Sequence, residues 1–327
     1  MRSNATAVGP STLARMPTCS AHGSEMLRHA VLGPGGIGAL LAGLLARAGR
    51  EVVLLVRPQS LQSYPGRIQI ESALLGSFAV EVEAESQLSC EVDVLWVTPK
   101  ATFLDAAVGL APPDQVSGAA VIPLMNGFDH IARLRDRYEL VIAGAIRVES
   151  ERDPDWVVHQ PSPFIRVELG PGSEEIAREL RGAGIECTVR EDEAELLWQK
   201  LAFLAPVALT TSARGEPIGA VRTDRRWRAR LEGAQAEVVA VASAEGVVID
   251  EVALRSLHAA VPDATQSSMQ KDVTAGRQPE LDAIAGPILR SGARNGVDVP
   301  VTRELVALVE QRVAAAPLTE CSAETHD

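Results

Sequence analysis

Apolar and polar positions follow two different patterns along the chain. In the front part, short apolar runs of strand type occur at 29–32, 52–56, 67–71, 78–82, 93–98 and 119–125. Helical patterns separate several of these runs, at 37–48 and 101–110, and further strand-like pieces between 140 and 170 precede a helix near 173–181 and a strand at 185–189. Strands that alternate with helices in this way predict an α/β fold with a mostly parallel, doubly wound sheet.

The back part of the chain reads as helix throughout. Apolar positions recur at helical spacing over five segments: 193–212, 225–244, 250–260, 280–295 and 302–315. The 327 residues are enough for about two domains. The pattern therefore predicts a Rossmann-like domain over 27–191 and an all-helical domain over 192–317, with disordered extensions at 1–26 and 318–327.

Composition and charge limit the kinds of partner. A net charge of −12 disfavours nucleic acid, so we interpret the arginine-rich segment 222–230 as a solvated helix face. No apolar run reaches the ~18–20 residues that cross a bilayer, so no membrane partner is expected. The cysteines are widely separated, without a CxxC pair or a histidine at ligand spacing: Cys19, Cys90, Cys187 and Cys321. They predict neither a metal site nor a disulfide framework, and they favour a cytoplasmic location.

The first predicted strand is followed by a glycine turn, a helix and a second strand. Gly33, Gly35 and Gly38 stand in GxGxxG spacing, and Gly36 and Ile37 complete the turn. In such a motif the first glycine permits the tight bend, the second lets backbone amides approach a pyrophosphate, and the third lets the helix pack on the strand. An ordinary glycine-rich turn is the alternative, but the strand–turn–helix context favours a dinucleotide site.

Three polar residues follow strands of the predicted sheet. Arg57 ends the second strand, where an enzyme that prefers NAD carries an acidic residue; a guanidinium suits a 2′-phosphate, so NADP is the expected cofactor. Lys100 and Asn126 follow the runs at 93–98 and 119–125. Because ligands of open α/β sheets bind at the carboxyl ends of strands, both are expected to line the nicotinamide end of the site. The alternatives are a solvated surface arginine, an exposed loop lysine and a turn asparagine.

Lys200 interrupts an otherwise apolar helical stretch, ELLWQKLAFLAPVALTT. Its ammonium either lies on the one exposed stripe of a buried helix or faces a cleft. Burial would lower its pKa and make it a better proton donor near neutrality. Lys200 is therefore a candidate general acid.

These motifs together resemble the ketopantoate reductase (2-dehydropantoate 2-reductase) family over about residues 27–313. They are the glycine turn, Arg57, VTPK at Lys100, MNG at Asn126, LLWQK at Lys200, and SSMQKDVTAGRQPELDAIAG with Ser268 and Glu280. The resemblance implies a Rossmann domain and a helical domain with the active site between them, and reduction of a small 2-oxo acid to a 2-hydroxy acid by NADPH in pantothenate biosynthesis. It leaves a homodimer open.

The resemblance also assigns roles to single residues. It makes Lys200 the group that protonates the developing alkoxide, and Glu280 a partner that orients Lys200 or the cofactor. It makes Asn126 and Ser268 substrate contacts, and it requires no metal. From the residues alone, Ser268 could equally cap a helix and Glu280 could be a favourable carboxylate in a first helical turn.

The chain departs from the family where substrate-binding asparagines usually stand. Those positions are Leu204, Ala208 and Ala285, while Thr265 replaces an asparagine of some members and AIRVES (145–150) replaces a threonine-rich stretch. If Leu204, Ala208 and Ala285 line the cleft, they give the substrate an apolar wall. Three interpretations stay open: a ketopantoate reductase, a relative that reduces a less polar 2-oxo acid or ketone, and a non-catalytic NADP-binding sensor.

Overall fold

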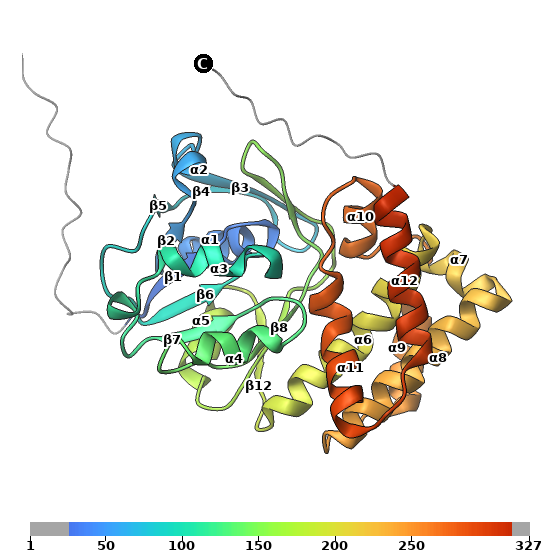
Figure 1. The fold of residues 1–327 in the computed structure, drawn as a ribbon. Coiled ribbons are helices and arrows are strands. Elements are labelled where there is room, and N and C mark those ends of the chain that lie inside the picture. The colour runs from blue at the N-terminus through green and yellow to red at the C-terminus, as the bar shows by residue number, and fades with distance from the viewer. Residues whose placement is uncertain (1–25, 316–327) are drawn as a thin grey trace, which may run out of the picture.

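The computed structural model describes residues 26–315 in two halves that lie side by side (Figure 1). One half contains all the strands and helices α1–α5, and the other contains helices α6–α12. The predicted order of a Rossmann-like domain followed by a helical domain is confirmed. The extensions predicted at 1–26 and 318–327 lie outside the described residues, apart from Met26.

The first half is organised around a five-stranded, all-parallel sheet of order β5-β2-β1-β6-β7. Its strands are β1 (Arg28–Leu32), β2 (Glu51–Leu55), β5 (Glu83–Glu85), β6 (Val94–Val97) and β7 (Ala120–Pro123). Leu32 of β1 pairs with Leu55 of β2 and with Val97 of β6. The carboxyl ends of the central strands therefore lie level, and the loops that follow them share one edge of the sheet.

Helix α1 (Gly36–Arg47) is apolar on all sides because it is covered on both faces. Every residue from Gly38 to Leu45 is buried. One face packs on the parallel sheet, and the other packs on a second sheet of order β4-β3-β10-β9. That sheet consists of β3 (Arg67–Ser72), β4 (Gly76–Glu81), β9 (Glu151–Arg152) and β10 (Val157–Gln160). The prediction of one doubly wound sheet is wrong for the strands near 67–71 and 78–82, which form an antiparallel pair over α1.

The opposite face of the parallel sheet is covered by α3 (Leu104–Ala107) and α4 (Asp129–Arg135). The helix predicted at 101–110 is instead a series of short turns in which only α3 is α-helical, and the prolines at 112 and 113 prevent its continuation. A third sheet, β12-β11-β8, combines β8 (Gly144–Arg147), β11 (Arg166–Leu169) and β12 (Glu186–Val189), with α5 (Glu174–Gly182) packed on it. The short helix α2 (Pro58–Gln62) follows β2.

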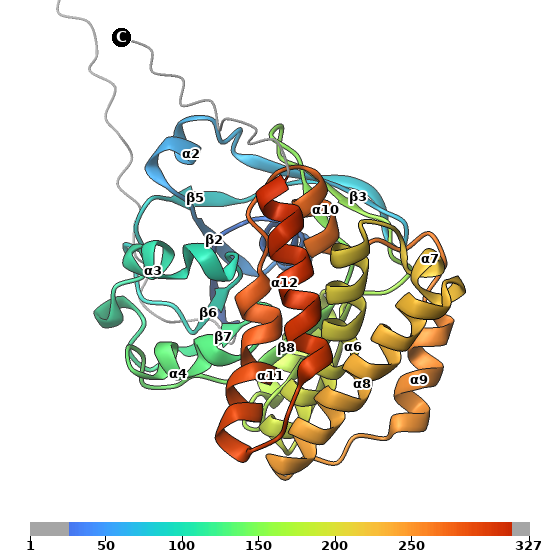
Figure 2. The same cartoon turned by 45° about the vertical axis from the view of Figure 1, so that its right-hand side comes forward.

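Helix α6 (Glu193–Arg214) is the central element of the second half and contacts every other helix there. Asp192 caps its first turn by accepting a hydrogen bond from the Glu195 backbone N–H, and Gly215, at φ +77°, ends it. Figure 2 shows α6 between α11 and α12 on one side and α8 and α9 on the other. The surrounding helices are α7 (Ile218–Thr223), α8 (Arg225–Ala244), α9 (Glu251–Ala260), α10 (Ser268–Thr274), α11 (Leu281–Asn295) and α12 (Pro300–Ala315). Within residues 26–315, no helix combines the length and apolarity needed to cross a membrane.

Alanine substitutions at two glycines of the GxGxxG motif are expected to change stability by different amounts. A Cβ added to Gly38 would collide with Thr98 Oγ1 and lie 2.9 Å from the Gly33 carbonyl oxygen, whereas no atom lies within 4 Å of a Cβ added to Gly35. We expect Gly38→Ala to lower the free energy of unfolding by about 1–3 kcal/mol, and Gly35→Ala by no more than about 1 kcal/mol. Urea denaturation of both variants measures this difference. Equal losses would show that α1 does not depend on this close approach.

Candidate active site

The glycine turn between β1 and α1 has the local geometry that its motif predicts. Gly33 adopts φ +78°, in the left-handed region that favours glycine. Gly35 faces open space, and Gly38 lies against Thr98, whose hydroxyl donates to the Leu32 and Gly33 carbonyls at 2.9 Å each. The first backbone N–H groups of α1 have no intrahelical acceptor. They are available to an anion at the positive end of the helix dipole.

Arg57 lies at the same edge of the sheet, directly after β2. Its side chain is exposed, and it forms no hydrogen bond or ion pair with any residue of the range 26–315. A cation beside a dinucleotide turn, without a partner in the described part of the chain, fits an anionic group of the ligand.

The loops that follow β6 and β7 meet the helical half. Glu280, at the N-terminus of α11, accepts hydrogen bonds from the Ala101 backbone N–H at 2.8 Å and from the Asn126 side-chain amide at 3.0 Å. Lys100 Nζ lies 2.7 Å from Asp272 Oδ2 of α10. The structure therefore brings Lys100, Asn126 and Glu280 together at the interface between the halves, although they are far apart in sequence.

Lys200 projects from α6 into the same interface. Its side chain is buried, and its Nζ donates a hydrogen bond to the Met125 carbonyl at 2.7 Å, one residue before Asn126. Burial lowers the pKa of Lys200 to about 8; the charge of Arg147 acts in the same direction, and the charge of Glu280 opposes it. This burial excludes the alternative that Lys200 lies on an exposed stripe.

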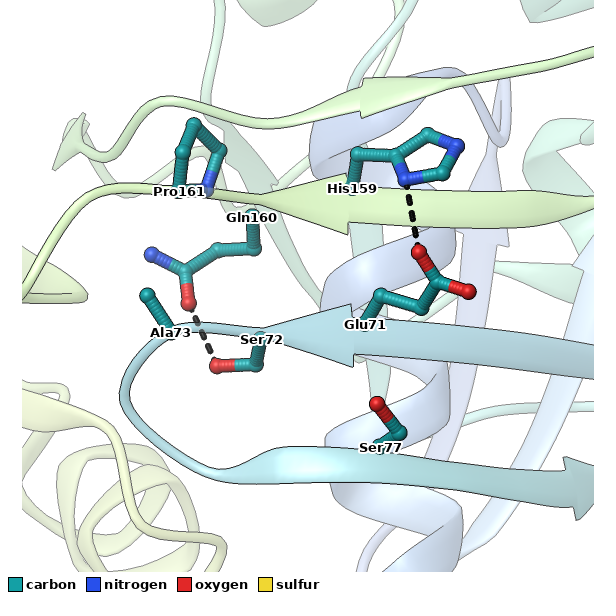
Figure 3. Close-up of a pocket in the computed structure, with 7 residues that line it drawn as sticks. All are labelled: Glu71, Ser72, Ala73, Ser77, His159, Gln160 and Pro161. Carbon is teal, nitrogen blue, oxygen red and sulfur yellow. Dashed lines mark hydrogen bonds and ion pairs between the residues drawn. The ribbon is translucent and has the colours of Figure 1, made fainter.

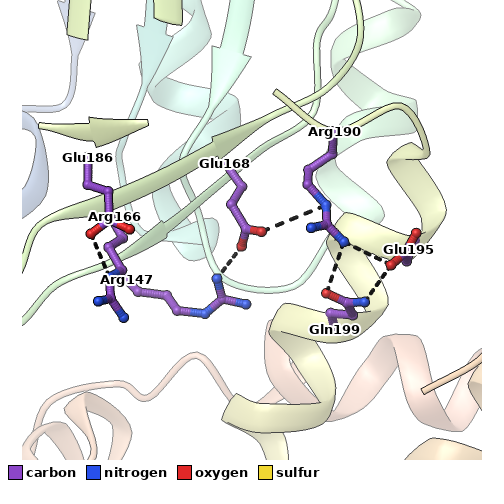
Figure 4. A network of polar contacts seen from close by, with 7 residues as sticks. All are labelled: Arg147, Arg166, Glu168, Glu186, Arg190, Glu195 and Gln199. Carbon is purple, nitrogen blue, oxygen red and sulfur yellow. Dashed lines mark hydrogen bonds and ion pairs between the residues drawn. The ribbon is translucent and has the colours of Figure 1, made fainter. Parts of the chain in front are cut away.

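Arg147, the last residue of β8, is a second cation whose charge acts on Lys200. It pairs with Glu168 of β11, and the contacts continue through Arg190 to Gln199 of α6 (Figure 4). Gln199 directly precedes Lys200. The network joins the first turns of α6 to the third sheet and so holds the lysine against the strand ends.

His130 of α4 is a further buried group in the field of Lys200. Burial lowers its pKa to about 3, and the charges of Lys200 and Arg133 contribute in the same direction. It is therefore neutral at physiological pH. No sequence signal marks His130, Arg147 or Asp272, because their local patterns match an ordinary helix-face histidine, strand-end arginine and helical aspartate.

The residues expected near the substrate lie at different depths. Leu204 of α6 is half-buried. Ala208 and Ala285 are at most 1% exposed within the helical core, so the structure does not support the expectation that they line the cleft. Ser268 is exposed at the first position of α10, and the residue that caps this helix is Ser267.

A surface hollow of about 350 Å³ lies elsewhere, on the second sheet (Figure 3). Ser72 and Gln160 hydrogen-bond inside it at 2.5 Å, and the exposed pair His159–Glu71 lies 3.1 Å apart at its rim. None of the interface residues lines it. Within residues 26–315, no group of three or more His, Cys, Asp or Glu side chains could hold a metal ion.

A dinucleotide turn on a parallel sheet, facing a helical domain across a buried lysine, defines the class of two-domain dinucleotide-dependent oxidoreductases. Comparison with known proteins narrows this class. The family model "Ketopantoate reductase PanE/ApbA" matches residues 29–174, and "Ketopantoate reductase PanE/ApbA C terminal" matches residues 194–313. The chain belongs to the ketopantoate reductase family.

Individual relatives agree with the family match. The chain is 30% identical over 295 residues to the 2-dehydropantoate 2-reductase of Caulobacter vibrioides, covering 86% of this chain and 97% of the relative. A PanE/ApbA family ketopantoate reductase from Ralstonia eutropha JMP134 superposes with a TM-score of 0.81 at 28% identity, covering 88% and 99% of the two chains. A D-mandelate dehydrogenase solved with NADH and anilino(oxo)acetate shares the fold, with a TM-score of 0.79 at 19% identity over 88% and 99%.

Replacement of Lys200 by methionine tests how unfavourable the buried ammonium is. Its pKa is about 8 in the folded protein against 10.5 for a free lysine, so between these values the unfolded chain holds a proton that the folded protein lacks. Stability contributed by this group therefore rises with pH from 8 to 10.5, and the penalty is full below pH 8. We expect Lys200→Met to raise the free energy of unfolding at pH 7 by about 1–3 kcal/mol, and by less at pH 10. Urea titrations of both proteins measure this, and a difference that does not change with pH would contradict the burial.

Proposed function

We propose that this chain reduces a 2-oxo acid to the 2-hydroxy acid with NADPH, and that 2-dehydropantoate (ketopantoate) is the first candidate substrate. The observation that carries the proposal is the buried Lys200 ammonium, with a pKa of about 8, at the carboxyl ends of the parallel strands. Relatives named 2-dehydropantoate 2-reductase support the substrate. We assign residues 27–191 to a cofactor domain and 192–317 to a substrate domain.

The residues at the sheet edge fit NADPH. The open space at Gly35 and the free amides of Gly36 and Ile37 suit a pyrophosphate. Arg57, exposed and without a side-chain partner among residues 26–315, suits the 2′-phosphate. Lys100 and Asn126 follow the next strands and are assigned to the nicotinamide end. When bound, the reduced nicotinamide supplies a hydride to the substrate carbonyl carbon.

In this proposal Lys200 is the general acid. An ammonium carries three N–H donors, and the bond to the Met125 carbonyl uses one of them. The others have no acceptor among residues 26–315, so they can bind the substrate carbonyl oxygen, stabilise the negative charge that develops there and donate a proton to it. The neutral amine that remains is tolerated, because burial favours the uncharged form.

Glu280 is assigned a positioning role. Its two carboxylate oxygens accept hydrogen bonds from Ala101 and Asn126 and so hold the loops after β6 and β7 against α11. Its charge also favours the protonated form of Lys200. Asn126 and the exposed Ser268 are assigned to the polar groups of the substrate.

Reduction of a less polar 2-oxo acid is the second candidate function. Leu204 lies one helical turn after Lys200 and is half-buried, so it offers hydrocarbon where the resemblance leads us to expect an amide. An apolar contact gains nothing from a substrate hydroxyl. This observation favours a substrate with a hydrocarbon side chain.

The decisive assay follows NADPH absorbance with ketopantoate and with 2-oxo acids that carry hydrocarbon side chains. We expect turnover, a loss in kcat on the order of 10²-fold or more for Lys200→Ala, and a kcat/KM that falls as pH rises above about 8, where Lys200 loses its proton. Lys271→Ala is the matched control, since Lys271 pairs with Glu149 on the surface. Unchanged turnover in Lys200→Ala would overturn the assignment of the acid.

The same panel separates the candidate functions. A higher kcat/KM for ketopantoate supports the first candidate, and a preference for a hydrocarbon side chain supports the second. NADPH binding without turnover of any 2-oxo acid would instead point to a non-catalytic NADP-binding sensor.

Arg57→Ala tests the preference between cofactors. Only NADPH carries the 2′-phosphate, so we expect its Kd to rise by on the order of tenfold or more while the Kd of NADH stays nearly constant. Calorimetric titration with both nucleotides measures the two constants. Equal weakening of NADPH and NADH would sink the assignment of Arg57.

A further inference from the structure

Arg152 of β9 lies over the glycine turn, although 118 positions separate it from Pro34. Its Nε donates a hydrogen bond to the Pro34 carbonyl at 2.8 Å. The neighbouring Ser150 hydroxyl donates to the Gly36 carbonyl at 2.8 Å, and a Cβ added to Gly36 would collide with the Ser150 backbone. The segment from Ser150 to Arg152 is therefore packed directly on the turn and forms one wall beside it.

The guanidinium of Arg152 is only partly used by the protein. It has five N–H donors; one binds Pro34 and another binds the Asp153 carbonyl at 2.7 Å. No carboxylate lies within ion-pair distance of it among residues 26–315, although the side chain is half-buried. Burial lowers the pKa of this guanidinium, with partial opposition from the Asp153 charge. A cation that has lost part of its water without gaining a counter-ion is poised for an anionic ligand.

Trp156 holds this guanidinium in place. The centre of its ring lies 4.2 Å from Arg152 Cζ, and the ring also packs against Tyr64, with ring centres 4.5 Å apart. Trp156 is the only non-glycine residue of the range 26–315 with a positive φ, at +63°. This left-handed backbone conformation is unfavourable for a residue that carries a Cβ. The strained hairpin turn places a buried indole under the arginine and restricts its motion.

We propose that Arg152 is a phosphate-binding residue of the dinucleotide site and that it contacts the pyrophosphate lying against the glycine turn. The inference rests on the proposed function, because it assumes a dinucleotide at that turn. The free donors of the planar guanidinium match phosphate oxygens that also face the Gly36 amide. Arg57, exposed after β2, is assigned to the 2′-phosphate instead. The two arginines thus serve different phosphates of one cofactor.

The test measures Kd for NADPH and NADH by calorimetry on the full chain. Both nucleotides contain the pyrophosphate, so we expect Arg152→Ala to raise both constants by the same factor, on the order of ten- to a hundredfold. The Kd of NADPH should also depend less steeply on NaCl concentration than in wild type. Arg47→Ala is the matched control, because Arg47 lies at the other end of α1, with its Cζ 4.3 Å from the centre of the Phe78 ring. Its removal should leave both dissociation constants unchanged.

Two fragments of NADPH distinguish the loss of a phosphate contact from a general loosening of the β9–β10 hairpin in Arg152→Ala. ADP-ribose contains the pyrophosphate but no 2′-phosphate, so Arg152→Ala should weaken it and Arg57→Ala should not. Adenosine 2′-phosphate contains the 2′-phosphate but no pyrophosphate, so Arg57→Ala should weaken its binding and Arg152→Ala should not. If Arg152→Ala leaves NADH and ADP-ribose unchanged, or weakens both fragments equally, the inference is wrong while the proposed function stands. If wild type binds neither NADPH nor NADH, the proposed function fails and this inference fails with it.

Discussion

The hydrogen bond from Lys200 to the Met125 carbonyl is the constraint around which the two halves are arranged. A buried ammonium is unfavourable unless its donors are satisfied, and here the acceptor belongs to the loop after β7 while the lysine belongs to α6. The helical half must therefore dock at the carboxyl edge of the sheet. The pKa of about 8 follows from this docking, since burial is its largest cause. The docking that positions α6 thus also buries its lysine and lowers the pKa of the ammonium toward neutrality.

The remaining charges of the interface are mostly neutralised within the protein. Lys100 and Arg277 both pair with Asp272, and Glu280 is bound by neutral N–H donors. Arg57 and Arg152 differ, because neither has a carboxylate partner among the described residues. In a chain with a net charge of −12, an anionic cofactor meets a repulsive field. Cations left unpaired at the turn offset that repulsion where the phosphates are expected to bind.

The sequence revealed the features whose chemistry is local. Gly33, Gly35 and Gly38 each have the geometry that their spacing predicts, because a strand–turn–helix motif contains nearly all of its own contacts. Lys200 was visible because a charge stood out in an apolar helix. The position of Arg152 beside the glycine turn could not be predicted, because it depends on a contact with Pro34, which is distant in sequence.

The errors in the predicted fold have the same physical origin. Helix α1 is buried continuously from Gly38 to Leu45, and this all-round apolarity signals cover on both faces. The pattern does not indicate which strands cover the second face of α1. The hairpin β3–β4 is therefore predicted as part of the main sheet, although it packs on the other face of α1. Depth along α6 is equally hidden: Leu204 and Ala208 share a helical stripe, yet one is half-buried and the other lies in the core. Periodicity gives the direction of a side chain, while its depth depends on the neighbouring helices.

Strand order accounts for the arrangement of the proposed site. The sheet order is β5-β2-β1-β6-β7, and the candidate residues follow its last four strands: Arg57 after β2, the glycine turn after β1, Lys100 after β6 and Asn126 after β7. Arg152 of β9 lies over the glycine turn. Adjacent strands lie about 4.8 Å apart, so these groups form a row along one edge. In the proposed function that row corresponds to the 2′-phosphate, the pyrophosphate and the nicotinamide of one extended cofactor. The nicotinamide end then falls at β7, where the Met125 carbonyl holds Lys200, so the level carboxyl ends of the strands bring the hydride donor and the proton donor to the same place.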